Sequence, residues 1–308
     1  MTRYASEPLI SIIIPTYNRP KQLTACLLSL VRSEYPRDRF EVIAVDDGSD
    51  QPMDSVVTGF ENRLNIKLIR QKNAGPAAAR NKGAEHAKGV FLAFTDDDCQ
   101  PRPDWLRVLA KYCTGNSCHL IGGSTINSLP RNLFSSASQN LVSYLYQYYN
   151  GQNRNMTFFA SNNMLLPARH FREIGGFNTS FPLAAGEDRE FCDRWQHNGF
   201  HTIYAPEAVV QHTHAMTLCS FWRQHFNYGR GAFYFHRIRA GRCHTTLKIE
   251  PFSFYRDLLI FPVLQSKGLK SFLLTGLMFV SQLANSLGFF WEMRRQKIVL
   301  GHDDNHIF

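Results

Sequence analysis

The first hundred residues alternate short, largely apolar runs with amphipathic segments, and this alternation limits the folds open to the chain. Residues 9–14, 40–45, 65–70 and 91–94 have the length and composition of strands. Between them, apolar residues recur at helical spacing after Pro20, and Pro76 stands just inside the start of another helix. Buried strands joined by helices predict an α/β fold, with a mostly parallel, Rossmann-like sheet and helices on both faces.

Three consecutive aspartates, Asp96, Asp97 and Asp98, follow the apolar run 89–94. Neighbouring carboxylates repel one another, and each raises the pKa of the next unless a cation lies close by. Asp96 and Asp98 form an Asp-x-Asp pair, a set of hard oxygens that suits Mg²⁺ or Mn²⁺. The alternative is a solvated loop in which Asp98 caps the next helix.

The other polar segments of this region also follow predicted strands. They are residues 15–18 and 46–49, and Arg80 lies in a helix that leaves a strand. Ligands of open α/β sheets bind beyond the carboxyl ends of the strands. Each segment alone could be an ordinary turn or helix cap. Together they predict one crevice for a nucleoside diphosphate and its metal.

Four segments of this half resemble the family 2 glycosyltransferases, which have the GT-A fold: 11–19, 45–49, 73–83 and 94–98. The resemblance continues through 163–164, 175–177, 186–188 and 210–212, and it covers roughly residues 9–240. It implies transfer of a sugar from a nucleoside diphosphate sugar, expected to be UDP-linked, to an acceptor hydroxyl. It also implies a single inverting displacement, in cell-surface or exopolysaccharide assembly.

The same resemblance implies which residues hold the donor. Tyr17 would stack on the nucleobase, Asp47 would read the imide N–H of a uracil, and Arg80 would face the base and phosphates. Asp46 would orient its loop or contact the ribose, which Asp96 would also face. The implied donor-binding set is Pro15, Tyr17, Asp46, Asp47, Arg80, Asp96, Asp97 and Asn163. From the residues alone, Tyr17 could be a tyrosine at the rim and Arg80 a solvated arginine.

The implied metal ligands are Asp98, Asp96 and His212, and the cofactor is Mn²⁺ or Mg²⁺. Such a cation neutralises the diphosphate leaving group, where the largest charge develops in this reaction. The neighbouring histidines, His214 among them, are assigned to packing or the surface, because no paired cysteine spacing supports a zinc site.

Glu187 and Asp188 open an amphipathic segment that stops at Gly199. Acidic residues in a first helical turn commonly complement the helix dipole. The resemblance instead favours Asp188 as the general base, which must reach within about 3 Å of the attacking hydroxyl. Glu187 would contact the acceptor or neighbouring loops. Arg223 or Arg230 would reach the diphosphate or an acceptor phosphate, unless both belong to an exposed basic helix face.

We expect a catalytic domain at residues 1–240, with a nucleotide-binding half at 9–115 and an acceptor half at 116–240. A basic, apolar helical region follows at 241–308. Residues 212–308 hold 12 basic and 5 acidic side chains, so most of the net charge of +9 lies there. The uncharged run 271–291 is long enough for a bilayer core of about 30 Å. Its polar residues and glycines favour an interfacial helix within 250–300 over a span, with a soluble helical cap as the alternative.

Composition also bears on location and partners. Seven cysteines, an odd number, and a polar segment at residues 1–8 in place of a signal peptide predict reduced thiols in the cytoplasm, at the cytoplasmic face of a membrane. A glycan or lipid-linked acceptor would suit that place. Charge confined to one quarter, without a recognisable motif, argues against nucleic acid.

Two other functions compete with transfer. A sugar nucleotidyltransferase would carry a glycine-rich basic loop where residues 15–18 stand. A catalytically inactive nucleotide-sugar binding protein is disfavoured by the intact Asp98, Asp188 and His212. The signature Gln-x-x-Arg-Trp of processive relatives is absent from the sequence, so we expect single-residue transfer.

Overall fold

The computed structural model describes residues 7–113, 119–150, 158–243, 250–266 and 268–300. The chain divides into two compact units. The first comprises residues 1–128, 148–180 and 188–214, and the second comprises 129–147, 181–187 and 215–308. This division differs from the predicted boundary at residue 240, because residues 129–147 and 215–240 group with the C-terminal helices. Parts of the predicted segments 1–8 and 241–308 lie outside the described residues.

The first unit is built on one eight-stranded sheet in the order β3-β2-β1-β4-β7-β6-β8-β5. The strands are β1 Ile10–Thr16, β2 Phe40–Asp46, β3 Ile66–Arg70, β4 Phe91–Phe94, β5 Cys99–Pro101, β6 His119–Asn127, β7 Met164–Pro167 and β8 His201–His212. Strands β3, β2, β1 and β4 are parallel, as predicted. The second half is mixed, since β7 is antiparallel to β4 and β6 and β5 is antiparallel to β8. One sheet therefore crosses both predicted halves.

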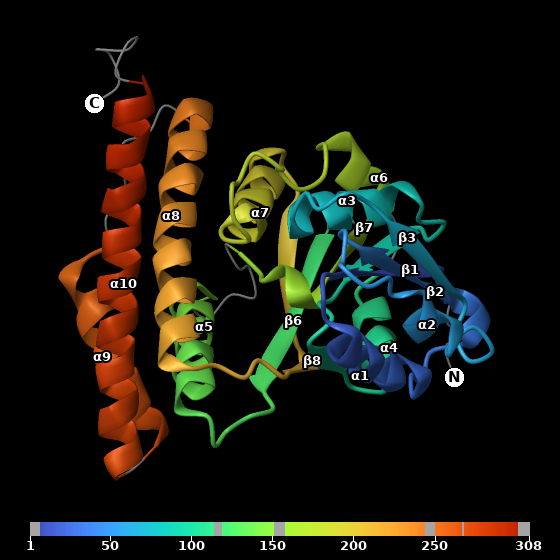
Figure 1. The fold of residues 1–308 in the computed structure, drawn as a ribbon, viewed down its shortest axis with the longest axis horizontal. Helices are drawn as coiled ribbons and strands as arrows, with labels where there is room; N and C mark the ends of the chain where they lie inside the picture. Colours follow the sequence, from blue (N-terminus) through green and yellow to red (C-terminus); the bar gives the residue numbers. More distant parts are fainter. Residues whose placement is uncertain (1–6, 114–118, 151–157, 244–249, 267, 301–308) are drawn as a thin grey trace. The chain divides into compact units, whose positions relative to one another are not determined.

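Helices cover both faces of this sheet (Figure 1). Side chains that alternate along a strand point to opposite faces. Ile12 and Ile14 accordingly join a core with α1 Pro20–Val31 and α4 Trp105–Ala110. Ile43 and Val45 belong to a separate core with α3 Pro76–Glu85. Strand ends and helix starts thus meet at the carboxyl edge of the parallel strands, as the sequence predicted.

The remaining helices of this unit follow in chain order. They are α2 Asp54–Thr58, α6 Ala168–Glu173 and α7 Glu187–His197, of which only Glu187 groups with the second unit, with short 3₁₀ turns at Arg37–Arg39 and Ser161–Asn163. Helix α7 is anchored by aromatic packing: the Phe191 ring lies 4.7 Å from Phe177, which lies 5.2 Å from Phe94 at the end of β4. These contacts fix the start of α7 relative to the aspartates that follow β4.

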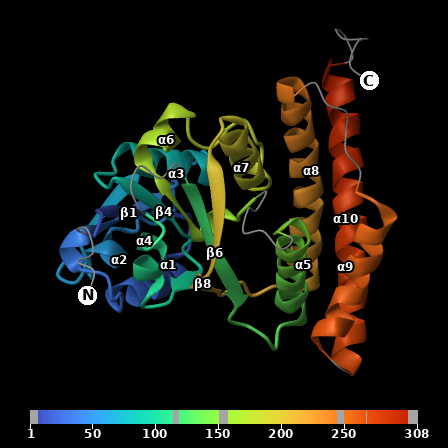
Figure 2. The same cartoon turned by 180° about the vertical axis from the view of Figure 1, so that it is seen from behind.

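The second unit consists of α5 Leu133–Asn150, α8 Leu218–Cys243, α9 Phe252–Gln265 and α10 Leu269–Leu300. Helices α8 and α10 run side by side in the same direction (Figures 1 and 2). Two glycines allow this approach, because a Cβ at Gly229 would collide with the carbonyl of Asn285 and one at Gly288 with that of Phe226. Helices α5, α9 and α10 share an apolar core around Tyr144, Leu258 and Met278.

Candidate active site

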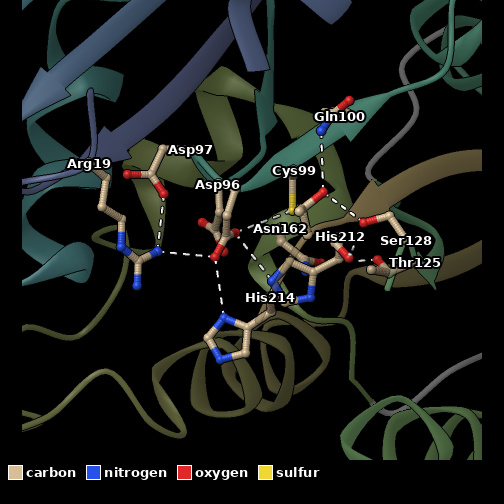
Figure 3. A network of polar contacts seen from close by, with 12 residues as sticks. Arg19, Asp96, Asp97, Cys99, Gln100, Thr125, Ser128, Asn162, His212 and His214 are labelled. Carbon is tan, nitrogen blue, oxygen red and sulfur yellow. Dashed lines mark hydrogen bonds and ion pairs between the residues drawn. The ribbon is translucent and has the colours of Figure 1, made fainter. Parts of the chain in front are cut away.

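Pairing between two short strand ends creates the centre of the site. Strand β5 lies antiparallel to β8 with Cys99 opposite His212, and the backbone N–H of Thr213 donates to the carbonyl of Asp98. The Asp98 carboxylate therefore lies between two imidazoles: Oδ1 is 3.2 Å from His212 Nε2 and Oδ2 is 3.5 Å from His214 Nδ1. Figure 3 shows the His212 and His214 rings close to each other in this network, with their centroids 5.3 Å apart.

Charge in this cluster is mutually stabilised. Burial alone would raise the pKa of Asp98, but hydrogen bonds from His212 and His214 outweigh it and hold that pKa well below its usual range. Burial would likewise lower the pKa of His212, yet the hydrogen bond to Asp98 leaves that pKa above its ordinary value. The cluster therefore retains an ionised carboxylate even though Asp98 is buried.

The donor chemistry of Asp98, His212 and His214 fits a divalent cation. One potential ligand atom from each residue lies within 4.8 Å of the others. A carboxylate with two imidazoles suits Mn²⁺ and other transition ions better than Mg²⁺, which prefers oxygen. His214, assigned to packing from sequence, thus joins the cluster. The spacing His212-x-His214 at a strand end was the available signal, because alternate residues face the same side.

Asp96 is placed differently from the predicted ligand set. Its Oδ1 lies 2.7 Å from Nη2 of Arg80, in an ion pair. Arg80 is buried, and its guanidinium also lies 5.7 Å from the Phe177 ring. The alternative of a solvated surface arginine is therefore wrong. This pair places a fixed positive group beside the aspartate cluster, in the middle of α3.

Asp97 and Arg19 complete the cluster. Arg19 Nη1 donates to Asp97 Oδ1 at 3.2 Å and to Asp98 Oδ2 at 3.0 Å. Figure 3 marks the contact between Arg19 and Asp97 with a dashed line. The Thr16 hydroxyl donates to Asp97 Oδ2 at 2.8 Å. Burial raises the pKa of Asp97 to about 6 despite the Arg19 charge. Arg19 belongs to a motif quoted from sequence, but no role was predicted for it.

Asp188 lies at the start of α7, and the charges of Arg80 and Asp96 act on it. Its Oδ1 accepts the backbone N–H of Arg189 at 2.8 Å. Burial raises the pKa of Asp188, the Arg189 hydrogen bond and the Arg80 charge oppose this, and Asp96 adds to it. A carboxylate with a raised pKa is a better proton acceptor. Glu187 is buried and belongs to the second unit.

The carboxylates of Asp46 and Asp47, at the end of β2, accept hydrogen bonds from the backbone of neighbouring loops. Asp46 Oδ1 accepts the backbone N–H of Ser49, which matches the loop-orienting role. Asp47 accepts backbone N–H groups of Ala74 and Gly75 at 2.9 Å and the side chain of Gln71 at 2.7 Å. In this conformation Asp47 thus anchors residues 71–75. Base recognition by Asp47 therefore remains a prediction, and it would require an additional contact.

Pro15 and Tyr17 lie at the carboxyl end of β1, on the same edge of the sheet. Pro15 is buried within β1, so it shapes the strand end rather than presenting a polar group. Tyr17 is 45% exposed just beyond it. An exposed ring at this place is available to stack on a flat ligand.

Asn163 has a structural role instead of the predicted contact with the donor. Its side-chain amide donates to the carbonyls of Ser124 and Ala208 at 2.9 Å each, and its Oδ1 accepts from Trp105 Nε1 at 2.8 Å. These three bonds use both amide hydrogens and the oxygen of a buried side chain. Asn163 ties strands together, and we leave it out of the proposed donor site.

Arg230 is likewise committed to other contacts. Its Nε lies 2.6 Å from Oε2 of the fully buried Glu292, and its guanidinium lies 4.5 Å from the Trp291 ring. This ion pair joins α8 to α10 within the second unit, and the contact of Arg230 with a phosphate stays a prediction. Arg223 is exposed on α8.

Comparison with known proteins decides the family. Residues 11–175, more than half of the chain, match the family described as Glycosyl transferase family 2. The chain belongs to glycosyl transferase family 2. Residues 142–217 of this glycosyltransferase also match the family described as N-terminal domain of galactosyltransferase. Both matches confirm the family predicted from the motifs.

Curated relatives share part of their length with this family 2 glycosyltransferase. It is 26% identical over 227 residues to glycosyltransferase AglE of Haloferax volcanii, covering 73% of each chain. It is 30% identical over 246 residues to validoxylamine A glucosyltransferase of Streptomyces hygroscopicus, covering 69% of this chain and 58% of that one. Hyaluronan synthase of Pasteurella multocida is 31% identical over 217 residues, 59% of this chain but only 22% of the synthase.

Solved structures confirm the GT-A fold. Mannosyltransferase PcManGT from Pyrobaculum calidifontis, in complex with GDP-Man and Mn²⁺, superposes with a TM-score of 0.60 at 19% identity, covering 97% of this chain and 82% of that one. TarS of S. aureus, residues 1–349, gives a TM-score of 0.55 at 18% identity and covers 96% and 92%. At these identities the likeness establishes the fold alone.

Proposed function

We propose that this family 2 glycosyltransferase transfers a sugar from a UDP-linked donor to a hydroxyl of a glycan or lipid-linked acceptor, with inversion, in cell-surface polysaccharide assembly. The observation that supports this is the grouping of three elements in the first unit. They are the Asp98–His212–His214 cluster, the pair of buried Arg80 with Asp96, and Asp188, whose pKa responds to both members of that pair.

Asp98, His212 and His214 would hold the Mn²⁺ or Mg²⁺, and the two imidazoles favour Mn²⁺. When bound, such a cation supplies positive charge to the departing diphosphate. The Mn²⁺ found with GDP-Man in the PcManGT structure supports this assignment. Asp96 stands outside this set, because among the described residues only Asp98, His212 and His214 have ligand atoms within 4.8 Å of one another, and Oδ1 of Asp96 pairs with Arg80.

The chain's own residues account for the remaining steps. Arg80, buried and oriented by Asp96, offers a fixed cation to the donor phosphates without first losing its own hydration. Asp188 takes the proton from the acceptor hydroxyl at a carboxylate oxygen, and its raised pKa strengthens it as a base. Tyr17, exposed at the rim, would cover the nucleobase.

We infer a location in the cytoplasm, at the cytoplasmic face of a membrane. The described cysteines support a reducing compartment, since Cys26, Cys99, Cys113, Cys192 and Cys219 are all free thiols. Single-residue transfer is proposed because the sequence lacks the processive signature.

The test is a screen of the purified full chain against a panel of nucleoside diphosphate sugars. Donor hydrolysis and transfer are measured with Mn²⁺, with Mg²⁺ and with EDTA. We expect turnover of one UDP-sugar that depends on the cation and is fastest with Mn²⁺. Undiminished turnover in EDTA would contradict the metal assignment. Nucleotide binding without turnover of any donor, with a suitable acceptor present, would favour an inactive binding protein.

A further inference from the structure

Helix α10 carries large apolar side chains on its exposed side, in addition to Leu274 and Met278 on its buried side. Phe272, Phe279 and Phe290 are 70%, 59% and 55% exposed, whereas Ser281 and Glu292 are 1% and 0% exposed. Leu283 and Leu287 continue the exposed side at helical spacing, so that one apolar stripe is formed by Phe272, Phe279, Leu283, Leu287 and Phe290. Soluble helices show the opposite pattern. An exposed apolar surface of this extent indicates a site that binds another protein or a membrane.

The turn between α9 and α10 extends this apolar stripe. Leu264 at the end of α9 and Leu269 at the start of α10 are both 76% exposed. Ile260 and Val263 on the last turns of α9 are exposed as well. Together with the stripe, these side chains form a larger continuous apolar surface than isolated exposed apolar residues would form.

The stripe lies on a helix that is long and apolar enough to cross a membrane. The most apolar 18-residue window within Leu269–Lys297 has a mean hydropathy of 1.4, and only 28% of that window is buried. The neighbouring helix α8 argues against α10 crossing the membrane. The contact between Gly288 and Phe226 sets the level of the two parallel helices. Arg223 precedes Phe226 by less than a turn, so this exposed arginine lies beside the uncharged run of α10. A charged side chain at that depth of a bilayer is strongly disfavoured.

The basic residues around α10 indicate which kind of surface would bind the apolar stripe. Residues 212–308 carry 12 basic and 5 acidic side chains. Lys270 stands near the start of α10, and Arg294, Arg295 and Lys297 are exposed at its far end. Basic residues at both ends of an aromatic and aliphatic face are the pattern of helices that lie in the interface of an anionic bilayer.

We propose that the α9 end and the α10 stripe bind an anionic lipid bilayer, with α10 lying in the plane of the interface. Phe272, Phe279 and Phe290 insert among the acyl chains, and the lysines and arginines contact the lipid phosphates. This surface belongs wholly to the second unit, and the inference does not depend on the proposed chemistry of the first.

Flotation of the full chain with vesicles tests the proposal. Two compositions are compared, phosphatidylcholine alone and phosphatidylcholine with phosphatidylglycerol. The variants are Phe279→Asp with Phe290→Asp, and Phe272→Ser as a milder change. Val90→Asp is the matched control, because Val90 is a 57% exposed apolar residue of the first unit. Thermal unfolding and nucleotide binding are measured for each variant, so that a folding defect or a failed catalytic site is distinguished from loss of lipid contact.

The wild-type chain and Val90→Asp are expected to float with the anionic vesicles and to do so less at high salt. The double variant should lose at least about tenfold in partition, and Phe272→Ser a smaller factor, with unfolding temperatures unchanged. Wild-type chain that stays in the dense fraction with both vesicles would overturn the proposal. So would a double variant that floats normally, or a wild-type dimer in solution that Phe279→Asp converts to a monomer.

Discussion

Arg19 Nη1 lies 3.0 Å from Asp98 Oδ2, so a cation of the protein already holds one oxygen of the candidate metal cluster. The same nitrogen also pairs with Asp97. The Arg19 side chain is 45% exposed, whereas Asp98 is buried. The arginine can therefore rotate into solvent while the carboxylate stays. Arg19 and a bound metal compete for the same negative charge.

Replacing Arg19 by alanine is expected to strengthen Mn²⁺ binding in the absence of nucleotide. A half-exposed ion pair is worth little, so the gain should be about 1.5- to 5-fold. Titration followed by the electron paramagnetic resonance of free Mn²⁺ measures it. Arg39→Ala is the control, because Arg39 is equally exposed and pairs with Asp38 outside the cluster. Unchanged or weaker binding by Arg19→Ala would show that the two cations do not compete.

His214→Ala should weaken Mn²⁺ binding by at least about tenfold, as His212→Ala should, because each removes one ligand from a set of three. Calorimetric titration measures the affinity. His201→Ala serves as the control, since His201 is exposed at the opposite end of the same strand. If His214→Ala binds like the wild type while His212→Ala does not, His214 only packs against its neighbour.

Asp188→Asn keeps the size of the side chain but removes its ability to accept a proton. We expect transfer to fall by about 10²- to 10⁴-fold while donor affinity stays within a factor of two of wild type, roughly the effect of losing a general base. Steady-state transfer and donor titration check the two parts. Asp193→Asn, on the same helix, should behave like the wild type. Normal transfer by Asp188→Asn would assign the base elsewhere.

His225 makes the second unit sensitive to acid. The ring is fully buried in α8, its centroid lies 4.3 Å from that of Phe221, and neither nitrogen has a hydrogen-bonding partner among the described residues. Burial lowers the pKa of His225 from 6.5 to about 4. Between these values the unfolded chain binds more protons than the folded one, so stability falls as pH drops through that window.

His225→Leu should remove this loss, which is about 3 kcal/mol when complete. Thermal unfolding at pH 7.5 and at pH 4.5 is the measurement. The variant is expected to lose much less stability on acidification than the wild type. His197→Leu, an exposed position, should follow the wild-type profile. Parallel acid profiles for wild type and His225→Leu would mean that His225 is not the group responsible.

Local patterns predicted the elements that local physics determines. The apolar runs around Ile12, Val42 and Ala93 became β1, β2 and β4, and Pro20 and Pro76 begin α1 and α3. The rule that ligands gather at the carboxyl ends of parallel strands then placed Arg80 and Asp96 close together, and the ion pair between them is what a buried arginine requires.

Features that depend on distant pairing escaped sequence reasoning. Arg230 of α8 forms an ion pair with Glu292 of α10, and the two residues are 62 positions apart in the sequence. No local pattern therefore reveals that the charge of Arg230 is already paired. The saturation of Asn163 depends on three other segments of the sheet. His214 joined the site only because β5 pairs with β8 in a register that places Cys99 opposite His212.

The most direct test of the account is a crystal of the protein with UDP and Mn²⁺, examined by anomalous scattering at the manganese edge. One strong peak is expected in contact with Asp98, His212 and His214 and with the diphosphate oxygens, and Arg19 is expected to be turned away from Asp98. A manganese peak on the diphosphate but remote from Asp98, with Arg19 still paired to it, would contradict the account.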